Sequence, residues 1–127
     1  MSDLRKVLCV EDEPDLQEVI GLALETVGGL TVESCGSGPK ALERVKPFGP
    51  DLILLDVMMP GMDGLATLEA LRADPETAHI PVVFMTAKVQ PDELAEYRRA
   101  GALDAIAKPF DPMTLADKLR ALHAKAP

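Results

Sequence analysis

The stretch from Pro50 to Gly64 constrains the fold most, because an apolar run in it ends abruptly in a carboxylate. Residues 52–55 (Leu-Ile-Leu-Leu) are too few to span a membrane and too continuous for a strand with one exposed face. They suit a central parallel strand that is covered on both faces. Asp56 follows at once, and the Met-Met-Pro-Gly that comes next continues neither a strand nor a helix. An aspartate in this place is commonly a turn former or a helix cap, so its role depends on the rest of the chain.

The composition predicts one domain of a cytoplasmic protein. With 127 residues, 47% of them apolar, the chain is long enough to bury a single sizeable core. The net charge of −8 argues against direct binding of nucleic acid or of an anionic membrane. No apolar run approaches the ~20 residues of a membrane span, and the N-terminus lacks the apolar core of a signal peptide. Cys9 and Cys35 have no metal-site spacing, so we expect buried, reduced thiols rather than a disulfide or a reactive cysteine.

Strand-like and helix-like segments alternate along the whole chain. Short apolar runs predict strands at residues 6–10, 30–35, 52–55, 82–85 and 103–107. Strands that alternate with helices in this way form a parallel sheet with helices on both faces. We therefore predict an α/β fold with five parallel strands and five helices.

The helices are predicted from apolar residues at helical spacing and from residues typical of helix ends. The first runs from Pro14 to Gly28-Gly29, and the second follows Gly38-Pro39 and is ended by Pro47 and Gly49-Pro50. Asp63-Gly64 opens the third, the fourth runs from Pro91 to Gly101, and Asp111-Pro112 begins the last. The expected buried positions are, in order along the chain, Leu16, Val19, Ile20, Ala23, Leu24, Val27, Ala41, Leu42, Val45, Leu65, Leu68, Leu71, Leu94, Tyr97, Leu115, Leu119 and Leu122.

Polar side chains follow four of the five predicted strands, at the edge where an open parallel sheet binds ligands. They are Glu11, Asp12, Asp56, Thr86 and Lys108. If the strand order is 2-1-3-4-5, the three carboxylates converge, and such a set either keeps a proton or binds a cation. Oxygen ligands at an open face suit Mg²⁺ and a phosphoryl oxygen, with Lys108 and Thr86 on the far side of the phosphoryl group. Each residue also has a simpler interpretation, as a helix cap, a strand-end hydroxyl or a solvated turn residue. The presence of all five residues at one edge of the sheet favours a site for phosphoryl transfer.

In four stretches, and across nearly its whole length, the sequence resembles the receiver domains of two-component response regulators. The stretches are residues 10–14 (Val-Glu-Asp-Glu-Pro), 51–64, 81–88 and 108–110 (Lys-Pro-Phe), and this order and spacing is highly specific. The resemblance implies a flavodoxin-like, doubly wound sheet of order 2-1-3-4-5. It also implies a receiver domain over residues 3–124, with no effector domain in this chain. Such a domain assists its own phosphorylation and dephosphorylation but is not a turnover enzyme.

The resemblance assigns the phosphoacceptor and the metal ligands. It implies that Asp56 takes a phosphoryl group from a histidine kinase or a histidine phosphotransfer protein. Glu11 and Asp12 would hold Mg²⁺ together with Asp56 and the backbone carbonyl of Met58. The family often has Asp-Asp where this chain has Glu11-Asp12, and the longer first carboxylate should still serve a water-mediated metal contact.

The resemblance also assigns the residues that respond to phosphorylation. Thr86 would be the switch hydroxyl that moves toward the phosphoryl group, and Lys108 would be its ion-pair partner. The family's Lys-Pro bond is typically cis, which the Lys108–Pro109 bond is expected to share. Ala105 departs from the family, which usually places Tyr or Phe three residues before the lysine, so the usual relay from threonine to aromatic ring is in doubt.

The leading hypothesis is a module that signals through phosphorylation-dependent protein contacts, with its downstream target on the face of the fourth helix, fifth strand and fifth helix. One alternative is an aspartyl-phosphate phosphatase on a related fold. Such enzymes carry a second Asp two residues after the nucleophile, and Met58 in that position cannot donate a proton. Another alternative is a receiver-like scaffold that never takes phosphate. Loss of Asp56, of the acidic pair or of Lys108 would favour it, and all are present.

Overall fold

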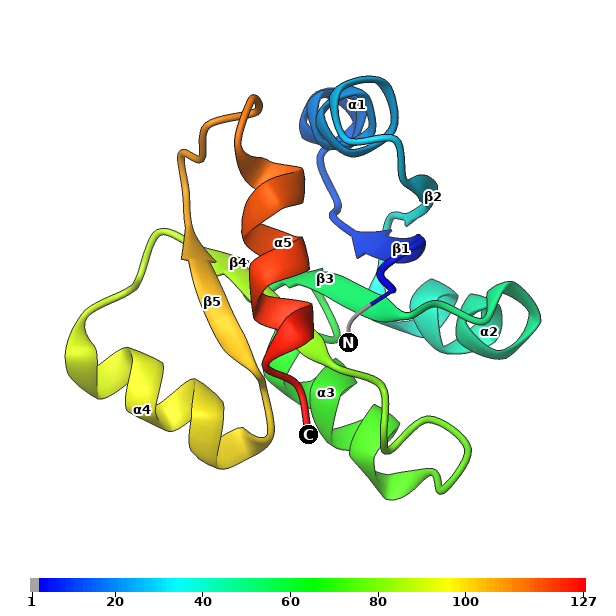
Figure 1. Cartoon of the computed structure of the whole chain (residues 1–127). Helices are drawn as coiled ribbons and strands as arrows, with labels where there is room; N and C mark the ends of the chain where they lie inside the picture. The colour runs from blue at the N-terminus through cyan, green and yellow to red at the C-terminus, as the bar shows by residue number, and fades with distance from the viewer. Residues whose placement is uncertain (1–2) are drawn as a thin grey trace.

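The computed structural model describes residues 3–127 as an α/β fold around five parallel strands (Figure 1). The strands are β1 (Lys6–Val10), β2 (Thr31–Cys35), β3 (Leu52–Asp56), β4 (Val82–Thr86) and β5 (Asp104–Ala107). Their order in the sheet is β2-β1-β3-β4-β5, and each neighbouring pair is parallel. The predicted fold class and strand order are therefore confirmed, and the strand positions agree with the prediction to within a residue at each end.

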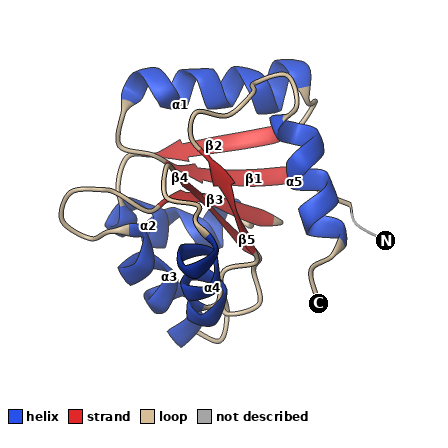
Figure 2. Ribbon diagram, turned by 90° about the vertical axis from the view of Figure 1, so that its left-hand side faces the viewer, coloured by secondary structure: helices blue, strands red, loops and turns tan. Residues whose placement is uncertain are grey.

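The helices cover both faces of the sheet (Figure 2). They are α1 (Pro14–Gly21), which continues as the π-helix η1 (Leu22–Val27), α2 (Gly38–Phe48), α3 (Gly64–Ala73), α4 (Pro91–Ala100) and α5 (Leu115–Ala124). Two buried clusters follow from this arrangement: α2, α3 and α4 pack on one face, and α1, η1 and α5 pack on the other. In residues 3–127, no helix is long and apolar enough to cross a membrane.

The side chains of the central strands alternate between the two clusters, as the period of two in a strand requires. Every residue of β3 and β4 is buried, as expected for strands covered on both faces. Cys9 belongs to the cluster under α1 and α5, whereas Cys35 belongs to the cluster under α2 and α3. Both cysteines are buried, and they do not form a disulfide with each other.

Helix ends follow the local chemistry that the sequence suggested, with two corrections. The Asp63 carboxylate accepts a hydrogen bond from the Ala66 N–H at 2.8 Å, so it caps α3 as predicted. Pro47 does not end α2, because it lies in the last turn, and the helix stops only at Gly49, whose φ of 65° is left-handed. The last helix begins at Leu115 rather than at Asp111, because a turn closed by the Thr114 N–H and the Asp111 carbonyl comes first.

The π-helix was not predicted, and it changes which residues of the first helix are buried. A π turn takes more residues than an α turn, so the apolar stripe rotates relative to the sheet. Val27 is 47% exposed and Val19, at the edge of the stripe, is 40% exposed, so the expectation that both are buried is wrong. The other four predicted positions of this helix are buried or half-buried.

Candidate functional site

The strand order brings three carboxylates together at the carboxyl end of the sheet. Glu11 and Asp12 directly follow β1, and Asp56 ends β3, which is the neighbour of β1. One carboxylate oxygen from each residue lies within 4.8 Å of the others. Glu11 and Asp56 are buried, whereas Asp12 is half-buried. The predicted convergence is thus present, and it depends on β1 and β3 being adjacent.

Backbone groups hold the two buried carboxylates in place. The Glu13 N–H donates to Glu11 Oε2 at 3.0 Å, and the Met58 N–H donates to Asp56 Oδ1 at 3.1 Å. The side-chain amide of Gln17, one turn into α1, donates to the Glu11 backbone carbonyl. Sequence patterns did not reveal Glu13 or Gln17 as contributors, because both lie at ordinary helix-start positions and only their geometry links them to the site.

Lys108 supplies the positive charge of the site. Its amino group lies 3.0 Å from Glu11 Oε1 and 3.3 Å from Asp56 Oδ2, so one cation bridges carboxylates from two strands. Burial lowers the pKa of Lys108, but the hydrogen bond to Glu11 and the charge of Asp56 outweigh it and raise that pKa overall. The Lys108–Pro109 peptide bond is cis, as expected.

Burial is the main cause of the raised pKa of two acidic groups near Lys108, the Glu11 carboxyl and the Cys9 thiol. It raises the pKa of Glu11 to about 7, although hydrogen bonds from the Glu13 N–H and from Lys108 act in the opposite direction. Burial also raises the pKa of the nearby Cys9 thiol to about 12, with the charge of Glu11 as a further cause. The cluster has three acidic side chains and one lysine, which is the condition under which a carboxyl group retains a proton or gains a cation.

Thr86 lies at the same edge of the sheet, and its hydroxyl is hydrogen-bonded to the loop after β4. It ends β4, one residue beyond Met85, which is the register partner of Asp56. Its side chain is buried, and Oγ1 accepts a hydrogen bond from the Lys88 N–H at 3.1 Å. The hydroxyl is thus bound by the loop after β4.

The loop after β3 closes tightly over Asp56. A Cβ on Gly64 would lie 2.5 Å from the Asp56 carbonyl oxygen, so only glycine permits this approach of the α3 N-terminus. Met58 projects outward from the same loop and is 64% exposed. Asp56 is therefore held by backbone and is itself buried, beside a loop whose Met58 side chain is exposed to solvent.

The residues at this edge fit a Mg²⁺ ion. Glu11, Asp12 and Asp56 offer only oxygen atoms, which is the ligand type that Mg²⁺ prefers. Their three negative charges exceed the single charge of Lys108, and Asp12 is the least buried of the three carboxylates. The site is thus an acidic cluster of the kind that holds the metal of a receiver domain.

Fold and site together define a receiver module, and comparison with known proteins gives the same family. The family described as response regulator receiver domain matches residues 7–120. The chain therefore belongs to the response regulator receiver family, and it is a phosphoacceptor signalling module rather than a catalytic enzyme. The alternative of a turnover phosphatase is excluded with it.

Individual relatives agree with this assignment. The chain is 38% identical over 117 residues to the DNA-binding response regulator MtrA of Mycolicibacterium smegmatis, covering 92% of this chain and 50% of that protein. Among solved structures, the chemotaxis response regulator CheY4 of Vibrio cholerae is 29% identical with a TM-score of 0.86, covering 94% of this chain and 99% of that one. A putative response regulator from Chloroflexus aurantiacus is 30% identical with a TM-score of 0.86, covering 97% and 100%. The chain spans about half the length of the curated relatives it matches.

Proposed function

We propose that this receiver accepts a phosphoryl group on Asp56, from a histidine of a sensor kinase or of a phosphotransfer protein, and signals through altered protein contacts. The observation that carries the proposal is the amino group of Lys108, which lies between Glu11 and Asp56 inside the acidic cluster. A cation in this position is suited to a phosphoryl oxygen on Asp56. Residues 3–124 would make up this receiver unit.

In the proposed reaction, a carboxylate oxygen of Asp56 forms a bond to phosphorus while the P–N bond of the phosphohistidine breaks. The electron pair of that bond stays on the imidazole nitrogen, which takes up a proton. The Met58 N–H holds the carboxylate in place, and Lys108 is within reach of the negative charge that the phosphoryl oxygens carry. Mg²⁺, held by Glu11, Asp12, Asp56 and the Met58 carbonyl, would neutralise further charge on those oxygens.

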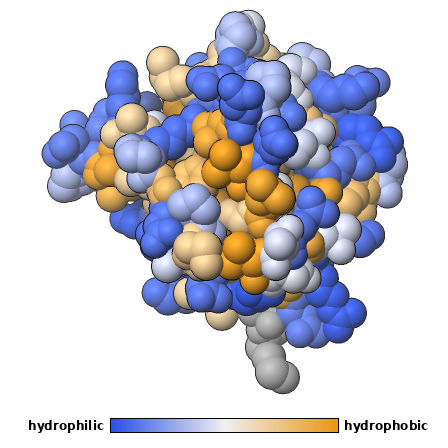
Figure 3. All heavy atoms as spheres, turned by 90° about the horizontal axis from the view of Figure 1, so that it is seen from above, coloured by the Kyte–Doolittle hydropathy of each residue, from blue (hydrophilic) through white to orange (hydrophobic). Residues whose placement is uncertain are grey.

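The phosphodonor protein must cover the surface around Asp56, and a groove beside the site offers it an apolar contact. The groove has a volume of about 510 Å³ and is lined by Leu16, Val19, Ala87, Lys108, Pro109 and Phe110. Lys108 belongs both to this groove and to the acidic cluster, so the two are continuous. Figure 3 shows apolar side chains gathered in the middle of the upper face, with hydrophilic ones around them. We place the downstream protein target on the separate face of α4, β5 and α5.

Labelling with the small phosphodonor acetyl phosphate tests the proposal. The protein should be labelled in the presence of Mg²⁺, and a chelator should prevent labelling. Asp56→Asn should abolish labelling, because an amide oxygen is too weak a nucleophile to form the acyl phosphate. Labelling that persists in Asp56→Asn or that ignores the chelator contradicts the assignment, and a wild-type chain that never takes label would be a receiver-like scaffold instead.

A further inference from the structure

Two hydrogen bonds connect Thr86 to helix α4 through a single residue of the intervening loop. The Lys88 N–H donates to Thr86 Oγ1 at 3.1 Å, and the Lys88 carbonyl accepts a hydrogen bond from the Tyr97 hydroxyl at 3.0 Å. Thr86 ends β4, and Tyr97 lies in the middle of α4. Any displacement of Lys88 that follows the threonine therefore acts directly on the tyrosine.

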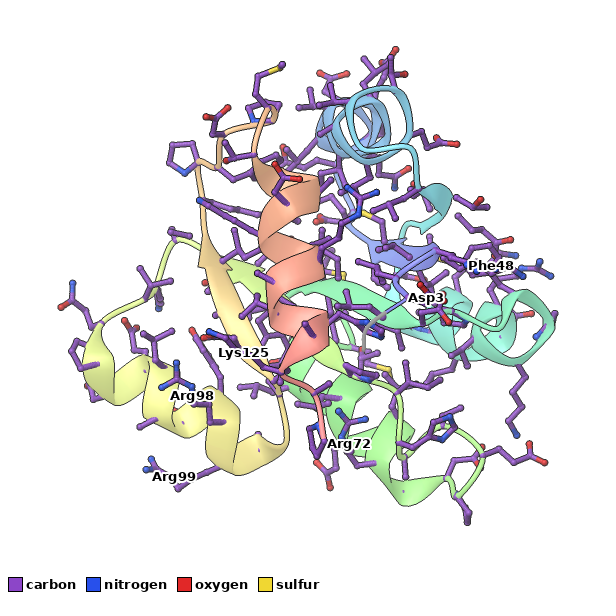
Figure 4. All side chains as sticks on the ribbon, viewed as in Figure 1. Asp3, Phe48, Arg72, Arg98, Arg99 and Lys125 are labelled. Carbon is purple, nitrogen blue, oxygen red and sulfur yellow. The ribbon has the colours of Figure 1, made fainter. Side chains whose placement is uncertain are left out.

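Tyr97 is the anchor of its helix. It is 5% exposed, and it is the one residue of α4 that is buried, whereas α3 buries four of its residues. Leu94 is half-buried, and the ion pair of Arg98 with Asp104 of β5 is largely exposed. Figure 1 shows α4 standing out from the sheet, and in Figure 4 Arg99 points away from the molecule. A helix held mainly at one side chain moves when that side chain moves.

The ring of Tyr97 also belongs to the buried cluster against which Ala105 packs. It packs edge-on against Phe84, with ring centroids 5.2 Å apart and an interplanar angle of 70°. Phe84 on β4 is the register partner of Ala105 on β5, and both belong to the cluster that contains Tyr97. Ala105 itself has only a methyl group, so the aromatic side chain of this cluster whose hydroxyl reaches the loop after Thr86 comes from α4.

We infer that Tyr97 reports the state of Asp56 and transmits it to α4. The inference rests on the proposed phosphorylation of Asp56. When the Thr86 hydroxyl donates to a phosphoryl oxygen, the Lys88 N–H must follow Oγ1 or lose its acceptor. The Lys88 carbonyl moves with the same residue, so the Tyr97 hydroxyl either follows it or loses this hydrogen bond, and the buried ring moves with the hydroxyl. The two phosphorylation states thus differ in the contacts that hold α4, which is what a population shift requires.

The composition of the chain allows a direct test. Tyr97 is its one tyrosine and there is no tryptophan, so intrinsic fluorescence reports this residue alone. The wild-type protein is titrated with the phosphoryl mimic beryllofluoride and Mg²⁺, and fluorine NMR of the bound mimic measures loading independently. We expect tyrosine emission to change with the same midpoint as loading. Thr86→Ala at full occupancy should lose that change, whereas the exposed-site control Thr31→Ala should keep it.

Amide hydrogen exchange gives a second readout that does not depend on fluorescence. On loading, the wild-type protein should change exchange over residues 87–99. Tyr97→Phe keeps the ring against Phe84 but removes the hydroxyl, so in this variant the change should be lost over α4 and kept in the loop. Loaded protein with unchanged emission, equal emission changes in Thr86→Ala, or equal exchange changes in Tyr97→Phe would overturn the inference. Failure of the wild-type protein to bind the mimic would overturn the proposed function and this inference with it.

Discussion

Charged residues lie at both ends of the parallel sheet, but their contacts differ. At the carboxyl end, Glu11, Asp56 and Lys108 contact one another. At the amino end, Asp51, Arg72 and Lys6 contact backbone groups instead. Asp51, at the start of the β3 segment, accepts the N–H groups of Arg5 at 3.1 Å and Lys6 at 2.9 Å.

The basic residues of the amino end show the same preference for backbone. Arg72 donates to the carbonyls of Ile80 and Gly101, each at 2.9 Å, and so ties α3 to the segments before β4 and β5 (Figure 4). Burial lowers the pKa of its guanidinium. The Lys6 amino group donates to the Phe48 carbonyl and lies 5.3 Å from the centre of the Phe48 ring.

This difference separates stabilising charges from reactive ones. A charge whose hydrogen bonds are taken up by backbone groups contributes to the stability of the fold and has little capacity left for a ligand. Charges that face each other across two strands are held in place by the fold but remain unequal in sum, so a cation or a phosphoryl group can complete them. Substitutions at the two ends should therefore affect different measurements.

The largest effect is expected for Asp12→Ala compared with Asp51→Ala. Loss of a group that only orients a metal ligand costs about 10–100-fold in affinity, so loss of the Asp12 carboxylate should lower Mg²⁺ affinity and acetyl phosphate labelling by about 100-fold or more. Asp51→Ala should be labelled at the wild-type rate but be less stable to urea. Equal labelling of the two variants would show that the acidic cluster does not act as the metal site.

Arg72→Met should lower the free energy of unfolding by about 2 kcal/mol, because two charge-assisted hydrogen bonds to backbone are lost. Urea denaturation measures this, with Arg99→Met as the control of the same residue type on exposed α4. Acetyl phosphate labelling of the folded Arg72→Met protein should be unchanged. If Arg72→Met were as stable as the wild type but were labelled poorly, the charges at the amino end would not be mainly stabilising ones.

Met58→Asn should shorten the lifetime of the phosphorylated protein several-fold. Met58 lies two residues beyond Asp56 and, with Lys88 at the rim, covers the path of hydrolytic water, so self-dephosphorylation of the wild type should be slow for a receiver. The decay of label after removal of donor measures the lifetime. Met113→Asn, an equally exposed methionine away from Asp56, is the control, and equal lifetimes for all three proteins would show that this rim does not control access.

The smallest effect is expected for Lys6→Met at the amino end. The contact of an exposed ammonium group with an aromatic ring contributes about 0.5–1 kcal/mol, so the free energy of unfolding should fall by no more than that and labelling should not change. Thermal unfolding against Lys40→Met, an exposed lysine without a ring contact, provides the comparison. A loss as large as that of Arg72→Met would mean that the amino end depends on Lys6 as a principal contact.

Periodicity and residue type predicted the alternation of strands and helices and the polar residues at the strand ends, whereas the strand order followed from the resemblance to receiver domains. The continuous run before Asp56 indicated a strand buried on both faces, because only such a strand has no polar alternation. The polar residues at the strand ends indicated the site, because the carboxyl ends of parallel strands share one edge. Asp63, Gly49 and Gly101 marked helix ends correctly, since capping depends on residues a few positions apart.

Contacts between residues that are distant in the sequence could be found only from the tertiary structure. The bridge from Lys108 to Glu11 depends on strand register and on the path of the loop after β5, and the Tyr97 hydroxyl reaches Lys88 only because α4 packs at one particular angle. The π-helix exposed Val27, and α2 continued through Pro47, because packing against neighbouring elements outweighed local preference. Periodicity predicts whether a residue such as Tyr97 or Arg72 is buried or exposed. It does not predict the partner of a hydrogen bond, because that partner is brought into reach only when the chain folds.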